Sequence, residues 1–266
     1  MAAPAWGQTV VLVEQRSYDA AARLECTVVR MNPAVFGALP TSACTLGPEG
    51  SQGPDRISQN LYDSADRLTE VRRAVGTPVE QTYVSYTYTA NGKQASVRDA
   101  NGNLSSYSYD GFDRLAQWNF PDKMTNGAVS ATDYETYSYD ANGNRLTVRK
   151  RDGNVIGYSY DALNRVTVKD VPGGAAADVY YGYDLQGHPL YARFGSAEGA
   201  GLTSRYEGFG RLISSSSNLS GAALTLGYQF DANDNRTRMT YPDGTFFTFD
   251  YDSLDRRTAV RENGGT

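Results

Sequence analysis

Apolar and polar residues alternate in short runs along almost the whole chain, and turn residues separate the runs. Residues 146–150 (Leu-Thr-Val-Arg-Lys) are one example. In an extended segment such alternation places side chains on two opposite faces, which is typical of a β-strand. Helix-favouring runs of Ala, Leu, Glu and Lys are nearly absent. The pattern therefore predicts an all-β protein built from short strands.

The runs recur with a fixed period, marked by an aromatic residue that is followed by Asp or a substitute. We call this aromatic residue the anchor. The base period is about 21 to 24 residues, interrupted by a Pro/Gly-rich insertion at residues 32–55 and a shorter one at 122–132. A constant period of this size indicates a repeat architecture. The ten anchors are Tyr18, Tyr62, Tyr88, Tyr109, Tyr139, Tyr160, Tyr183, Tyr206, Phe230 and Tyr251.

Each repeat reads as a β-hairpin. An Asp-x-x-Gly/Asn/Asp turn follows the anchor, and Arg stands five residues after the anchor in six repeats. Lys93 and His188 replace this Arg in two repeats, and Arg145 and Arg236 come one residue later, which we attribute to an extra Asn in their turns. Asp-Gly turns between alternating runs also indicate hairpins. Ten repeats predict about twenty antiparallel strands.

The motif Tyr-x-Tyr-Asp-x-x-Gly/Asn-Arg-Leu/Val resembles the RHS, or YD-repeat, family, with its best copies at residues 107–115, 137–146 and 158–166. The resemblance implies stacked hairpins in one long curved or spiralling sheet, an open segment of a β-cocoon shell. In toxin members of the family the shell encloses a C-terminal toxin domain and is closed by an RHS-associated core. We find no such core motif in residues 1–266. We therefore interpret residues 1–266 as a single YD-repeat array from a longer protein.

The resemblance also implies a function: a structural, non-catalytic shell segment of a toxin-related RHS protein, without cofactors. Its expected partner is the rest of the RHS protein or its C-terminal toxin domain, and its expected location is secreted or at the bacterial cell surface. Residues 1–8 nevertheless show no signal peptide. An alternative, a cleaved fragment like the autoproteolytic part of the family, is disfavoured because the core motif is missing.

The repeated Asp and Arg invite a catalytic interpretation, but catalytic residues are normally unique. The pair Asp161 and Arg165 recurs in several repeats. We expect Asp to fix each turn and Arg to cover aromatic rings with its stem and to pair at its tip. The single histidine, His188, is expected to be a variant turn residue rather than a general base. We therefore predict no catalytic residues.

Tyrosine is unusually frequent, with 20 residues against 9 Phe. We expect the rings to pack as cross-strand pairs on one face of the sheet. Glycan binding through Tyr109, Tyr139, Tyr160 and Tyr183 is the alternative function, because aromatic faces stack on sugar rings. Exposed edge strands also make self-association plausible.

Charge and cysteine content argue against some classes of function. A net charge of −5 without a run of Lys or Arg argues against nucleic-acid binding, and no stretch is apolar enough for membrane insertion. Cys26 and Cys44 are the two cysteines. They form either a disulfide or two free thiols, with free thiols slightly favoured, and with so few partners neither they nor His188 predict a metal site.

Overall fold

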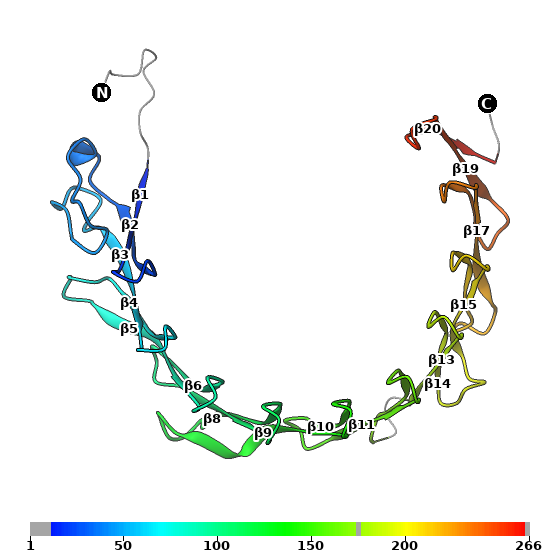
Figure 1. Cartoon of the computed structure of the whole chain (residues 1–266), viewed down its shortest axis with the longest axis horizontal. Coiled ribbons are helices and arrows are strands. Elements are labelled where there is room, and N and C mark those ends of the chain that lie inside the picture. The colour runs from blue at the N-terminus through cyan, green and yellow to red at the C-terminus, as the bar shows by residue number, and fades with distance from the viewer. Residues whose placement is uncertain (1–11, 174–176, 264–266) are drawn as a thin grey trace. The chain divides into compact units, whose positions relative to one another are not determined.

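The computed structural model describes residues 12–173 and 177–263, in which twenty β-strands and one short 3₁₀ helix, η1 (Pro33–Val35), are found (Figure 1). The strands belong to one sheet, and successive strands pair antiparallel. The all-β fold of stacked hairpins is thereby confirmed. The part of the chain before residue 12 lies outside the described residues.

The chain divides into two compact units, residues 1–135 and 136–266. The first contains β1 (Val13–Tyr18), β2 (Leu24–Arg30), β3 (Arg56–Tyr62), β4 (Leu68–Arg73), β5 (Gln81–Tyr88), β6 (Gln94–Asp99), β7 (Leu104–Tyr109) and β8 (Leu115–Pro121). The unit boundary falls within β9 (Val129–Tyr139). The organisation as a single array stays a prediction.

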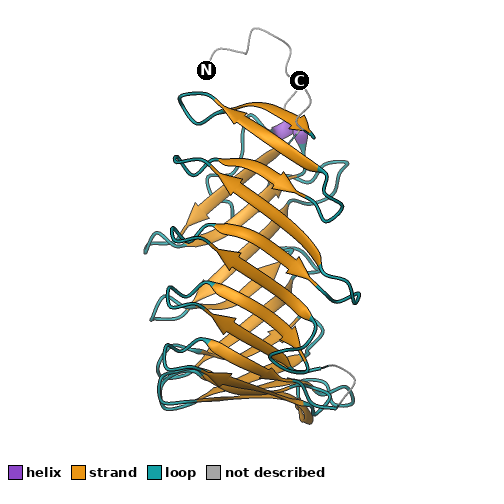
Figure 2. Ribbon diagram, turned by 90° about the vertical axis from the view of Figure 1, so that its right-hand side faces the viewer, coloured by secondary structure: helices purple, strands orange, loops and turns teal. Residues whose placement is uncertain are grey.

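The second unit holds the remaining strands, again joined as consecutive hairpins. They are β10 (Arg145–Arg149), β11 (Val155–Tyr160), β12 (Val166–Asp170), β13 (Val179–Tyr183), β14 (Pro189–Phe194), β15 (Gly201–Tyr206), β16 (Leu212–Ser217), β17 (Leu224–Phe230), β18 (Arg236–Thr240), β19 (Phe246–Tyr251) and β20 (Arg257–Glu262). Figure 2 shows the turns gathered at the two ends of the strands.

The register of the anchor hairpins is constant. Each anchor pairs with the residue six positions later, as Tyr160 does with Val166, and the ladder shifts by one residue directly beside this pair. Arg145 pairs with Tyr139 and Arg236 with Phe230 in the same way. The expectation that these two turns contain an extra Asn is therefore wrong: the turns keep their length, and Asn occupies the usual Arg position.

The two faces of the sheet differ in chemistry. In the hairpin of β7 and β8, Tyr109 lies opposite Leu115 and Tyr107 opposite Trp118, on what we call the anchor face. The intervening residues form the polar face, where Ser108 lies opposite Gln117. Side chains on both faces are mostly half-buried, as expected where a single sheet layer packs mainly against its own neighbouring strands.

The insertion at residues 32–55 covers the polar face of the first strands. Here the polar face carries Cys26, Val28 and Ile57, each at most 1% exposed, and Ala43 of the insertion packs against them. The insertion therefore lies against one face of the sheet. The physical reason is that the side chains of Cys26, Val28 and Ile57 are apolar, and the insertion shields them from water.

Two further contacts fix the insertion to the sheet. Cys26 of β2 and Cys44 of the insertion are joined by a disulfide, so the slight preference for free thiols was wrong. Arg30 and Asp55, both at most 5% exposed, form an ion pair of 2.7 Å. Arg30 also donates to the carbonyls of Ser42 and Thr45, so its buried charge is well satisfied.

Candidate functional site

The anchor turn is a compact hydrogen-bonded unit, and the turn after Tyr160 shows how the sequence builds it. Asp161 N–H donates to the Arg165 carbonyl, and Asn164 N–H to the Asp161 carbonyl, both at 3.0 Å. Asn164 has φ 61°, a conformation that Asn tolerates well. The Asp161 carboxylate accepts from the N–H groups of Leu163 and Arg165 and, at 2.7 Å, from Arg165 Nε.

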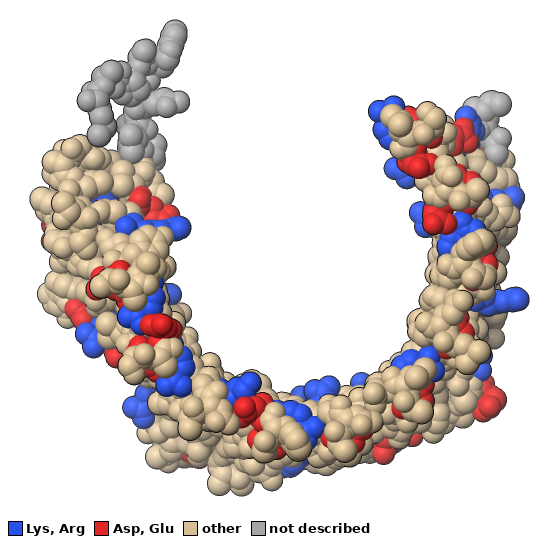
Figure 3. All heavy atoms as spheres, viewed as in Figure 1, with Lys and Arg blue, Asp and Glu red and all other residues tan. Residues whose placement is uncertain are grey.

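These contacts favour the ionised form of the Asp161 carboxylate. The side-chain and backbone hydrogen bonds from Arg165 hold the pKa of Asp161 below its ordinary value. Figure 3 shows acidic and basic side chains lying next to one another over the hairpin turns. The same carboxylate–arginine pair, four residues apart, occurs in Asp19–Arg23, Asp63–Arg67, Asp110–Arg114, Glu207–Arg211 and Asp252–Arg256, and in one further turn the Asp184 carboxylate contacts the His188 ring. Repeated, locally neutralised pairs of this kind fix turns rather than perform acid–base chemistry.

The arginine of one turn also reaches the next repeat. The Arg165 guanidinium lies 4.6 Å from the Tyr183 ring centroid, and its Nη1 donates to the Asp184 carbonyl at 2.9 Å. In return, the Tyr183 hydroxyl donates to the Val166 carbonyl at 3.0 Å. We call this pair of contacts between consecutive repeats the anchor clip. Arginine stacks on the next anchor in the same way in Arg23–Tyr62, Arg67–Tyr88 and Arg211–Phe230.

Tyrosines predicted to contact glycans donate their hydroxyls to backbone carbonyls within the sheet. Tyr109 bonds to the carbonyl of Gln94, Tyr160 to that of Arg145 and Tyr183 to that of Val166. Tyr139 lies at the end of β9, paired with Arg145. Burial raises the pKa of the Tyr109 and Tyr160 hydroxyls. These residues have a clear packing role, and glycan binding by them stays a prediction.

The hydroxyl bonds of the anchor clip predict that substitutions of two tyrosines of β11 differ in their effect on stability. We expect Tyr160→Phe to lower the free energy of unfolding by about 1 kcal/mol, because it removes a hydrogen bond of 2.8 Å to a backbone carbonyl. Tyr158→Phe is the matched control, because the Tyr158 hydroxyl forms no hydrogen bond within the described part of the chain. Urea unfolding followed by circular dichroism measures both. Equal effects of the two substitutions would show that the hydroxyl bond contributes nothing.

His188 keeps part of the clip geometry. Its Nδ1 lies 2.9 Å from the Asp184 carboxylate, and its ring stacks on Tyr206 with a centroid distance of 4.7 Å. A Cβ on Gly210 would lie only 2.8 Å from His188 Nε2, so glycine makes room for the imidazole. His188 thus takes the place of Arg in the turn, as expected.

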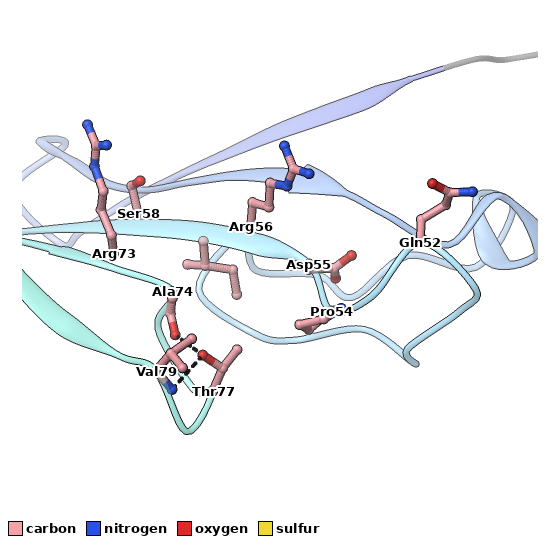
Figure 4. A pocket seen from close by; sticks show the side chains of 10 residues that line it. Gln52, Pro54, Asp55, Arg56, Ser58, Arg73, Ala74, Thr77 and Val79 are labelled. Atoms are coloured by element: carbon pink, nitrogen blue, oxygen red, sulfur yellow. Dashed lines mark hydrogen bonds between the residues drawn. The ribbon is translucent and has the colours of Figure 1, made fainter.

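A pocket of about 460 Å³ lies beside the insertion, lined mainly by residues of β3 and of the loop after β4. Figure 4 shows the Thr77 hydroxyl bonded to the Ala74 carbonyl and to Val79 N–H, whereas Arg56 and Arg73 point away from this loop. Asp55, on the pocket wall, is already paired with Arg30. The polar groups around this pocket therefore do not converge on a common point.

Two surveys complete the description of possible sites. Within residues 12–173 and 177–263, no three His, Cys, Asp or Glu side chains gather in a group able to hold a metal ion. Across the same residues, no helix has the length and apolar character needed to cross a membrane.

Comparison with known proteins gives similar folds at low sequence identity. The TcdB2–TccC3–Cdc42 crystal structure is 15% identical with a TM-score of 0.58, and the match covers 94% of this chain and 15% of that one. A Photorhabdus luminescens Tc holotoxin pore is 14% identical with a TM-score of 0.57, and the match again covers 94% and 15%. The chain thus spans about 15% of the length of these structures. A search of curated proteins gives no match.

A family model gives a sequence-level match. The model described as RHS Repeat matches residues 88–117, 139–176, 206–245 and 230–266, so matches occur in both compact units. The matched segments contain the clip arginines Arg165 and Arg211, whereas Arg23 and Arg67 lie outside them. With its recurring hairpins and its fold, this chain belongs to the RHS-repeat family.

Proposed function

We propose that this chain is a non-catalytic wall segment of an RHS shell that encloses or displays a C-terminal toxin domain. The observation that carries the proposal is the anchor clip. At least six anchor tyrosines and four arginines contact the neighbouring repeat, as Tyr183 and Arg165 do. A hairpin alone is marginally stable, so such series contacts suit a structural wall.

The disulfide supports the expected location. Disulfides persist in oxidising surroundings and are rare in the cytosol. The bond between Cys26 and Cys44 therefore favours a protein that is secreted or held at the bacterial cell surface.

Protease protection in the full-length protein tests the enclosure. We expect the C-terminal domain to be digested at least tenfold more slowly within the intact protein than when it is expressed alone. The double substitution Arg165→Ala with Tyr183→Phe breaks one clip and should speed this digestion, whereas Tyr158→Phe should not. Equal digestion rates of the domain in the intact protein and of the free domain would overturn the enclosure. Display of the domain on the outer surface would then be the remaining role of the shell.

A further inference from the structure

One anchor lacks the hydroxyl that the clip uses. Phe230 stands where six other repeats have an anchor tyrosine that donates to the backbone of the preceding repeat, namely Tyr62, Tyr88, Tyr109, Tyr160, Tyr183 and Tyr251. The equivalent acceptor for Phe230 is the carbonyl of Leu212, six residues after the anchor Tyr206. Within the described residues, no side chain donates to this carbonyl.

The next repeat lacks the covering arginine. At the usual Arg position stands Asn235, which bonds to the carboxylates of Asp231 and Asp255. Its side chain is too short to stack on the following anchor as Arg165 stacks on Tyr183. The ring of Tyr251 consequently has no guanidinium over it among the described residues.

These two departures meet in one pocket of about 360 Å³ within the second unit. Its size is within the range of small-ligand sites. Its walls are Leu212, Tyr228, Phe230, Arg236 and Tyr251.

Arg236 supplies the charge of this pocket. Its guanidinium lies 5.7 Å from the Tyr228 ring centroid and 5.3 Å from that of Phe249. It forms no ion pair with any described carboxylate. The residue is exposed, so its donors are available to a ligand.

We propose that this pocket binds a saccharide ring that carries a carboxylate, that is, a hexuronic acid. The apolar C–H face of the sugar lies against the uncovered Tyr251 ring, and a sugar hydroxyl donates to the Leu212 carbonyl in place of the missing phenol. The carboxylate pairs with the Arg236 guanidinium, whose planar donors match its two oxygens. The site goes beyond the shell role, in which Phe230 serves as the ring that Arg211 stacks on.

The chain contains a close internal counterpart. The equivalent sequence positions on β8, β9, β10 and β11 hold Leu115, Tyr137, Tyr139, Arg145 and Tyr160. The two sets differ by a single hydroxyl, on Tyr139 in place of Phe230. This makes Phe230→Tyr a substitution that follows the protein's own repeat: it restores the clip and occupies the open carbonyl.

Saturation-transfer NMR with sodium glucuronate tests the site on the whole chain. We expect glucuronate to bind the unaltered protein and its affinity to fall at least tenfold in Phe230→Tyr. The thermal midpoint of that variant should equal or exceed that of the unaltered protein, which shows that it is folded. Arg236→Gln should lower glucuronate affinity to that of glucose, the neutral counterpart.

The remaining outcomes decide against the proposal. Absence of glucuronate binding, or equal binding by Phe230→Tyr, would overturn it. So would equal affinity for glucose and glucuronate in the unaltered protein, because Arg236 would then not read the carboxylate. Competition by sodium acetate as strong as by glucuronate would show a simple anion site rather than a saccharide site.

Discussion

Replacing Asp55 by Asn is expected to lower the free energy of unfolding by about 3–5 kcal/mol, the range for breaking a buried ion pair. The Asp55 Oδ2 atom accepts from Arg30 Nη1 at 2.7 Å and from Gly47 N–H at 2.8 Å. The amide of Asn can take two orientations. In one, its NH₂ group faces the donors on Arg30 and Gly47; in the other, it faces Met31 N–H, which donates to Oδ1 in the unaltered protein. Either orientation leaves the Arg30 charge buried without its counter-ion.

Urea unfolding measures this effect, and Asp66→Asn is the matched control. Asp66 also pairs with an arginine, Arg23, but its side chain is 73% exposed. Exposed pairs contribute little, and Asn tolerates the positive φ of this position. We therefore expect almost no change in the control. If the Asp55→Asn protein is as stable as the control, the attachment of the insertion to the sheet does not depend on the Arg30–Asp55 ion pair.

The same carboxyl gives a pH dependence of known sign. Burial acts to raise the pKa of Asp55, but hydrogen bonds from Met31 N–H, Arg30 and Gly47 N–H outweigh it and hold the pKa below its ordinary value. The unfolded chain then takes up this proton at a higher pH than the folded one. The contribution to stability is complete above the unfolded value near pH 4 and is lost as the pH falls toward the folded value. This part of the acid dependence should be absent in Asp55→Asn.

Much of the fold follows from local pattern. The period, the strand alternation and the Asp-x-x-Gly/Asn/Asp turns predicted the hairpins because all three arise from contacts within about twenty residues. The error at Asn144 and Asn235 arose from aligning repeats by residue type. Aligned by position, Asn144 stands where Arg165 does and makes the same bond, from its amide to Asp140.

The position of the insertion depended on contacts that a period does not describe. Cys26 and Val28 stand where the other repeats have mostly polar residues, and this change was the available signal that something covers them. The choice between free thiols and a disulfide needed the knowledge that Cys44 returns to this face. Phe230 was grouped with the tyrosine anchors because the pattern concerns ring position. The role of its missing hydroxyl became visible only when the other anchors were seen bonded to backbone carbonyls.

Removing the disulfide is expected to lower the free energy of unfolding by about 3 kcal/mol. The bond closes a loop between residues 18 positions apart, and the entropy of closing a loop of this length corresponds to roughly that value. The variant Cys26→Ala with Cys44→Ala avoids placing a polar group in the core, where Cys26 is fully buried. Urea unfolding with and without dithiothreitol measures the effect. Reduction should destabilise the unaltered protein and leave the stability of the double variant unchanged. If dithiothreitol does not change the stability of the unaltered protein, the Arg30–Asp55 pair and the apolar cluster hold the insertion without the disulfide.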